Sequence, residues 1–177
     1  TVQQGHARRL RYTPAERSVV NEEFDQSNVV LAWTRSPSSR SESSMQLYYD
    51  AYDQGPQNGL WTVDFDARHR HAVGERHELV AGAGFRVWHN RALGYVPQHE
   101  SVRLFQAFLQ DEIELADRVY FTAGSKVEHN DYTGFEIQPS VRVLCQPTRA
   151  QAIWAAASRA VRTPSAGKRG YRAFFNT

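Results

Sequence analysis

Hydrophobic and polar residues alternate along most of the chain, and this alternation is the strongest signal in the sequence. The longest run is Phe135 to Gln146, where apolar residues take every second position and only Leu144 interrupts the polar series between them. Successive side chains of a β-strand point to opposite faces. The run therefore predicts a strand with one apolar wall and one polar wall, and Leu60 to Arg70 and Glu78 to Trp88 predict two more.

The same pattern predicts an all-β antiparallel meander of about eight strands, each roughly 8–13 residues long. The predicted strands are Asn28 to Arg35, Met45 to Tyr52, Leu60 to Arg70, Glu78 to Trp88, Leu104 to Glu114, Val119 to His129, Phe135 to Gln146 and Gln151 to Arg162. Residues 1–27 lack a sustained period and are predicted to form an exposed loop. Ser36 to Ser44 is predicted to be a nine-residue polar turn, and elsewhere short turns alternate with longer loops.

Strand length favours part of a transmembrane β-barrel. Strands in soluble domains average about 5–6 residues, whereas transmembrane strands need about 9–11. Aromatic residues near the predicted strand ends, among them Trp61, Tyr132 and Trp154, fit the girdles that such barrels place at the two membrane surfaces. A soluble β-sandwich that binds a ligand or a carbohydrate remains the alternative, because alternation alone does not exclude it.

Composition argues against several other classes of protein. No run approaches the roughly 18 apolar residues that a membrane-spanning helix requires. The formal net charge of +2 is too small to indicate a nucleic-acid partner. A single cysteine cannot form an internal disulfide, and no Cys/His cluster has metal-ligand spacing, so we expect neither a metal site nor a cofactor. No motif supports a nucleophile such as Ser158, and we expect no enzymatic activity.

Three segments in the second half of the chain carry a family resemblance. They are the strand with Gln110-Asp111-Glu112, the hairpin from Gly124 to Arg142 that includes EHNDYTGFEIQPS, and the segment WAAASRAVRTPS from Trp154 to Ser165. Together with similar strands upstream, they resemble the barrel of TonB-dependent outer-membrane receptors, over about Asn28 to Ser165. The tail, residues 166–177, does not continue the pattern.

The resemblance implies uptake across an outer membrane of the Gram-negative type. Such receptors form a 22-stranded barrel filled by an N-terminal plug, and they import scarce nutrients such as ferric siderophores or cobalamin with energy from the TonB complex. This sequence shows neither the plug nor the N-terminal segment that TonB holds. It is therefore interpreted as an internal barrel fragment, with TonB contact only through that missing region. The expected partners are outer-membrane lipid and a small-molecule ligand such as an iron chelate.

Two groups of residues are candidates for function. Polar members of the predicted strands are expected to line the barrel lumen, and they are Asp64, Asp66, Arg68, Lys126, Glu128 and Arg142. Of these, Lys126 and Glu128 point the same way and are expected to form a charge pair. Aromatic and polar residues at the loops suit an anionic iron chelate, and the expected ligand contacts are Trp88, Asn90, Tyr95, His99 and Tyr132. His69 and His71, on the apolar face, are expected at the membrane surface rather than in a metal site.

Overall fold

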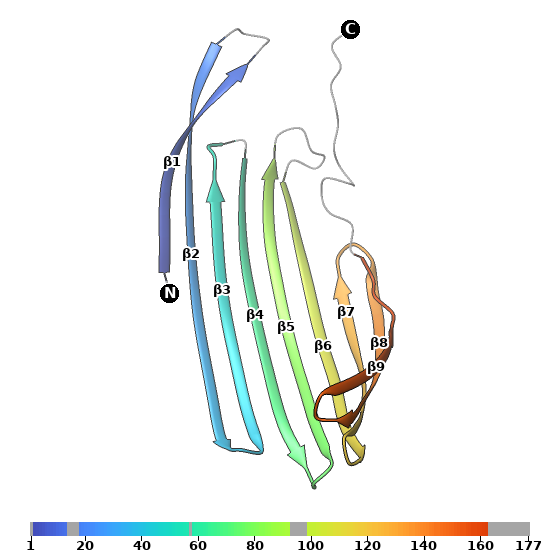
Figure 1. Cartoon of the computed structure of the whole chain (residues 1–177). Helices are drawn as coiled ribbons and strands as arrows, with labels where there is room; N and C mark the ends of the chain where they lie inside the picture. Colours follow the sequence, from blue (N-terminus) through green and yellow to red (C-terminus); the bar gives the residue numbers. More distant parts are fainter. Residues whose placement is uncertain (1, 14–17, 57, 93–98, 163–177) are drawn as a thin grey trace, which may run out of the picture.

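The chain forms one antiparallel β-sheet whose strands follow one another in sequence order (Figure 1). The computed structural model describes residues 2–13, 18–56, 58–92 and 99–162. The strands are β1 (Val2–Thr13), β2 (Ser18–Ser38), β3 (Ser41–Asp53), β4 (Asn58–Val73), β5 (His77–Ala92), β6 (His99–Ala116), β7 (Val119–Asn130), β8 (Gly134–Thr148) and β9 (Gln151–Ser158). The predicted all-β meander is confirmed, with nine strands in place of about eight. In the described residues there is no helix long and apolar enough to cross a membrane.

The connections at one end of the sheet are all tight. β2 ends at Ser38 and β3 begins at Ser41, so the predicted nine-residue turn is reduced to residues 39–40. The other turns at this end cover residues 74–76, 117–118 and 149–150. The opposite end carries the connections over residues 14–17, 54–57, 93–98 and 131–133. We call these two ends the turn end and the loop end.

The first two strands depart furthest from the sequence prediction. The loop predicted for residues 1–27 is wrong, because all 12 residues of β1 pair with β2. β3 pairs with β2 only from Asp25 onward, so the β1–β2 hairpin extends beyond the loop end of the sheet, as Figure 1 shows. This extension is a two-stranded ladder, and backbone hydrogen bonds form such a ladder whatever the polarity of its side chains. Its sequence does not need the period of two that identified the other strands.

The sheet has two chemically different faces. Paired residues from β3 to β8 have the same parity, so odd-numbered side chains share one face and even-numbered side chains share the other. We call these the apolar face and the polar face. Large hydrophobic side chains lie exposed on the apolar face: Met45, Leu47, Tyr49, Trp61, Phe65, Phe105, Leu109, Val127, Phe135, Ile137, Val141 and Val143.

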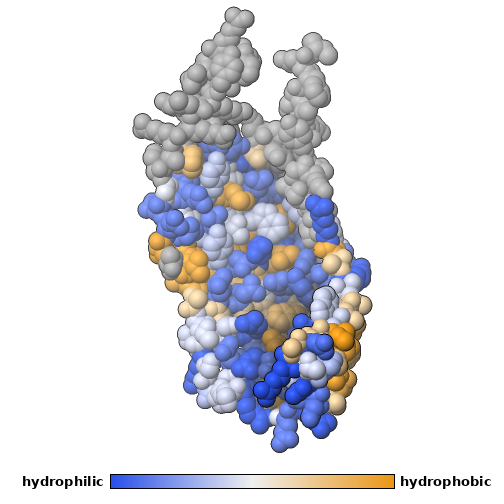
Figure 2. Space-filling view, in the orientation of Figure 1, coloured by the Kyte–Doolittle hydropathy of each residue, from blue (hydrophilic) through white to orange (hydrophobic). Residues whose placement is uncertain are grey.

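Hardly any hydrophobic core exists within this single layer. Val102 is the one hydrophobic side chain that is buried among the described residues. Figure 2 shows mainly hydrophilic residues over the middle of the face turned to the viewer, with hydrophobic patches toward its sides. In the described part of the chain no second sheet covers either face, and so the β-sandwich alternative finds no support. A contiguous exposed apolar face of this kind marks contact with lipid or with another apolar surface.

Candidate functional site

The polar face gathers the residues that the sequence predicted to line a lumen. All six of them have even numbers and lie on this face: Asp64, Asp66, Arg68, Lys126, Glu128 and Arg142. Strand pairing sets them in rows that run across the sheet. Arg68 lies in a row with Gly82, Phe108 and Lys126, because β4, β5, β6 and β7 pair in that register.

Most charges on the polar face are paired with a neighbour. Lys126 Nζ lies 2.9 Å from Glu128 Oε2, which confirms the predicted charge pair. Asp64, only 8% exposed, accepts a hydrogen bond from Arg86 Nε on the next strand. Burial of a carboxylate without a partner is costly. The contacts with Lys126 and Arg86 therefore allow the Glu128 and Asp64 side chains to be buried on this face.

A second charge cluster spans three strands near the turn end. Arg142 Nη2 on β8 lies 3.2 Å from Glu112 Oε2 on β6. Between them, the hydroxyl of Thr122 on β7 donates to the same carboxylate oxygen at 3.1 Å. The arrangement neutralises Arg142 and Glu112 and ties β6, β7 and β8 together across the polar face.

Two glycines on β5 make room for larger side chains of β6. A Cβ added at Gly82 would overlap the ring of Phe108, its partner in the register, and would lie 2.8 Å from the carbonyl oxygen of Ala67. A Cβ added at Gly84 would lie 2.8 Å from Gln106 Nε2. Glycine at these positions lets the β6 side chains lie over the β5 backbone.

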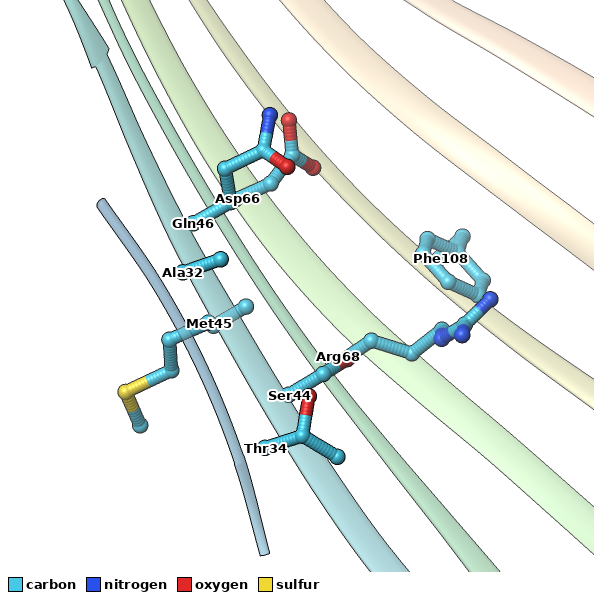
Figure 3. A pocket seen from close by; sticks show the side chains of 9 residues that line it. Ala32, Thr34, Ser44, Met45, Gln46, Asp66, Arg68 and Phe108 are labelled. Carbon is cyan, nitrogen blue, oxygen red and sulfur yellow. The ribbon is translucent and has the colours of Figure 1, made fainter. Parts of the chain in front are cut away.

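Beside these glycines the polar face is hollowed. An open hollow of roughly 430 Å³ lies over β2, β3, β4 and β6 (Figure 3). Its polar and aromatic lining consists of Thr34, Ser44, Gln46, Asp66, Arg68 and Phe108. Figure 3 shows the Arg68 side chain extended toward Phe108, while Met45 points away toward the opposite face. The sequence predicted the position of Arg68 but not the hollow around it.

The predicted ligand contacts at the loop end are only partly brought together. The rings of Trp88 and Tyr132 meet edge to face, with centroids 6.4 Å apart, and Asn90 lies on the same face as Trp88. His99 lies on the apolar face, where its ring stacks on that of His89 with centroids 6.0 Å apart, so the structure does not bring it to Trp88, and its contact with a ligand stays a prediction. Tyr95 falls outside the described residues.

Asn130 is a site residue that sequence analysis missed. Its side chain is only 1% exposed, and its Oδ1 accepts hydrogen bonds from the backbone N–H groups of Tyr132 and Thr133 at 2.9 and 2.8 Å. Its Nδ2 donates to Thr133 Oγ1 at 2.9 Å. These bonds fix the β7–β8 connection that carries Tyr132. The sequence signal was present, since an asparagine that bonds the backbone two residues ahead is typical of tight turns.

The neighbouring Asp131 ties the same connection to β6. Its Oδ2 accepts a hydrogen bond from the backbone N–H of Arg103 at 2.9 Å and lies 3.3 Å from Arg103 Nε. The backbone hydrogen bond from Arg103, aided by the guanidinium charge, holds the pKa of Asp131 below its ordinary value. The loop end therefore has an ionised anchor between β6 and the turn after β7.

Ring-bearing residues border the apolar face at both ends. At the turn end, His69 and His71 stack with centroids 6.0 Å apart, and His69 Nδ1 lies 2.8 Å from Ser43 Oγ. At the loop end, Trp61 stacks on His89 at 6.0 Å. The placement of His69 and His71 at a membrane surface fits this position and stays a prediction.

The comparison with protein families agrees with this architecture. Among the described residues no three or more His, Cys, Asp or Glu side chains come together as a metal site would require. Searches among curated proteins and solved structures found no match. The family model described as "TonB dependent receptor-like, beta-barrel" matches residues 3–177. The match includes the tail at 166–177, which the sequence prediction had set outside the family pattern. The chain belongs to the TonB-dependent receptor-like β-barrel family.

Proposed function

We propose that the chain forms part of the wall of an outer-membrane receptor that takes up a scarce small-molecule nutrient. The observation that carries this proposal is the single two-faced sheet, which exposes large hydrophobic side chains on one face and pairs charges on the other. Water on both sides of the sheet would leave the large hydrophobic side chains of the apolar face solvated. In a barrel wall the apolar face contacts lipid and the polar face lines the interior.

The width of the apolar band supports contact with a bilayer. On β4 the apolar face between Trp61 and His69 carries Val63, Phe65 and Ala67. Eight residues of strand span about 26 Å at about 3.3 Å per residue. A strand tilt of about 40° reduces this span to about 20 Å, which is close to the apolar band of about 25 Å in outer-membrane barrels.

In the same proposal the polar face is the inner wall, and the loop end lies outside the cell. Ligand capture is assigned to Trp88, Asn90 and Tyr132, with Tyr95 on the connection between β5 and β6. Aromatic surfaces beside polar groups suit a bulky chelate such as a ferric siderophore, or cobalamin. Energy would come from the TonB complex, whose contact we assign to a part of the receptor other than these strands. We assign no catalytic step to any residue.

Ligand binding with matched aromatic variants tests the proposal. Trp88→Ala and Tyr132→Ala are compared with Trp61→Ala, because Trp61 lies at the same loop end but on the apolar face. We expect ferric siderophore or cobalamin to bind the chain in outer-membrane vesicles, with each of the first two variants weakening binding about tenfold. An equal loss in Trp61→Ala, or a folded and monodisperse monomer without detergent, would contradict the assignment.

A further inference from the structure

Each of the four turns at the turn end carries one arginine. These arginines are Arg40, Arg76, Arg118 and Arg149, and all four residues are exposed. Among the described residues none of the four contacts an acidic side chain. The described parts of the connections at the loop end, residues 54–56 and 131–133, contain no arginine. Of the described connections, those at the turn end therefore carry the positive charge.

The guanidinium of Arg40 is held against the end of β4. Its Nη2 donates to the carbonyl oxygen of Ala72 at 3.3 Å and also to that of Gly74. These carbonyl groups carry no net charge, so the two bonds orient the cation without neutralising it. The N–H groups on Nε and Nη1 have no acceptor in the described part of the chain. They remain to donate to the oxygens of an anion, which a guanidinium fork contacts in pairs.

Arg76 brings a second cation to the same place. The β4–β5 turn covers residues 74–76, so Arg76 lies two residues from Gly74, whose carbonyl oxygen accepts from Arg40. Glu75 is the one acidic residue of this turn, and no ion pair joins it to either arginine. Arg40 and the turn together therefore carry two positive charges and one negative charge.

The apolar face continues up to these arginines. Val73, directly before the β4–β5 turn, lies on the apolar face opposite His77 and is 44% exposed. Ile153, four residues after Arg149, lies on the same face and is 67% exposed. A phospholipid carries a phosphate group next to its hydrocarbon chains, which matches this order of cation and apolar surface. Inorganic phosphate or an acidic soluble protein would leave the neighbouring apolar side chains without a partner.

The charges repeat across the sheet at a spacing that suits a lipid surface. Neighbouring turns are two strands apart, which is about 10 Å at about 4.8 Å per strand. Because this distance is close to the Debye length of about 8 Å in physiological salt, the fields of neighbouring turns partly overlap. Attraction of one arginine to an anionic lipid surface corresponds to about a fivefold enrichment of the anionic lipid.

We propose that the turn end binds the phosphate groups of anionic phospholipids such as phosphatidylglycerol. Arg40 and Arg76 form the main contact, and Arg118 and Arg149 extend it across the sheet. The short turns of outer-membrane barrels lie on the periplasmic side, so the lipid belongs to the periplasmic leaflet. This inference rests on the proposed function, because it requires that the apolar face lie in a bilayer, and it names the lipid partner of that face.

The lipid composition near each end of the sheet tests the inference. In a Cys145→Ser background, a fluorescent label is attached to a single cysteine at Val73, or at Phe135 on the apolar face beside the loop end. The chain is placed in phosphatidylcholine vesicles that contain a small fraction of nitroxide-labelled phosphatidylglycerol or nitroxide-labelled phosphatidylcholine. We expect phosphatidylglycerol to be enriched about fivefold over phosphatidylcholine near Val73, as measured by quenching. The two lipids should quench the label at Phe135 equally.

Single substitutions show whether the turn arginines cause the enrichment. Arg40→Gln should reduce the enrichment near Val73 at least twofold, and the double variant with Arg76→Gln should abolish it. Arg70→Gln is the matched control, because it removes the same charge from the same end of β4 but from a guanidinium that lies 3.1 Å from Glu78 Oε2. It should change the enrichment less than about 1.5-fold. Glu75→Gln should increase the enrichment by removing the negative charge of the turn.

Two results would separate this inference from the function on which it rests. Equal quenching of the Val73 label by the two lipids, or equal losses in Arg40→Gln and Arg70→Gln, would overturn the phosphate contact and leave the barrel-wall function intact. A Val73 label that neither lipid quenches would place this part of the apolar face outside the bilayer, and that result would overturn both.

Discussion

Replacement of Gly82 by alanine tests how closely the polar face is packed. The added methyl group would overlap the Phe108 ring and lie 2.8 Å from the Ala67 carbonyl oxygen. Overpacking of this kind costs about 1–3 kcal/mol. Against it stands the usual gain of about 0.5–1 kcal/mol when alanine replaces glycine inside a strand. We therefore expect Gly82→Ala to lower the free energy of unfolding by about 1–2 kcal/mol.

Gly5 on β1 provides the matched control. No atom lies within 4 Å of a Cβ added there, and its φ is not in the left-handed region. Gly5→Ala should therefore be neutral or stabilising by up to about 1 kcal/mol. Both variants are unfolded with urea in micelles, and unfolding is followed by circular dichroism. The slope of the unfolding free energy against urea concentration reports whether the surface exposed on unfolding has changed.

A double-mutant cycle identifies the cause of the Gly82 effect. Phe108→Ala removes the ring but leaves the Ala67 carbonyl oxygen in place. On that background Gly82→Ala should lose roughly half of its cost, a coupling of about 0.5–1 kcal/mol. Equal changes in the free energy of unfolding for Gly82→Ala and Gly5→Ala would refute this packing of Phe108 on Gly82. So would a double-mutant cycle that shows no coupling between Gly82→Ala and Phe108→Ala.

Two further predictions concern the β7–β8 connection. Asn130→Ala removes the acceptor of two backbone hydrogen bonds and should cost about 2 kcal/mol of unfolding free energy in the same urea assay; Asn90→Ala, at the same end and on the same face, should cost less than about 0.5 kcal/mol. Because the folded pKa of Asp131 lies below its ordinary value of 3.8, its stabilising effect is complete above that value and is lost as pH falls through the folded pKa. The stability difference between wild type and Asp131→Asn should therefore narrow below pH 3.8, and a difference that stays constant with pH would contradict the Arg103 contact.

The sequence predicted those parts of the fold in which one face is apolar. The run from Phe135 to Gln146 identified β8 within one or two residues, because an apolar wall leaves a period of two. The β1–β2 extension and the polar ends of β2 and β3 next to residues 39–40 left no such period. There the strands continue beyond the apolar band, and hydrogen bonding between backbones, which is independent of side-chain polarity, maintains them.

Some contacts of the candidate site could be predicted from the sequence and others could not. Two residues of one strand share a face whenever their numbers differ by two, so the Lys126–Glu128 pair was predictable. The pairing of Arg142 with Glu112 depends on the register of three strands, and turn lengths set that register. The face of His99 could not be predicted for the same reason, because it depends on the number of residues between β5 and β6 that leave the ladder.

The central claim is that the apolar face meets lipid while the polar face meets water, and β8 offers the most direct test. The single cysteine of the chain, Cys145 on the apolar face, is first replaced by serine so that labels attach only at chosen positions. In a Cys145→Ser background, single cysteines are placed at Ile137 and Val141 on that face and at Gln138 and Ser140 on the other. We expect nitroxides at the odd positions to be relaxed by oxygen from the bilayer, and those at the even positions by a water-soluble nickel chelate. Equal access of the chelate to all four positions would contradict the account.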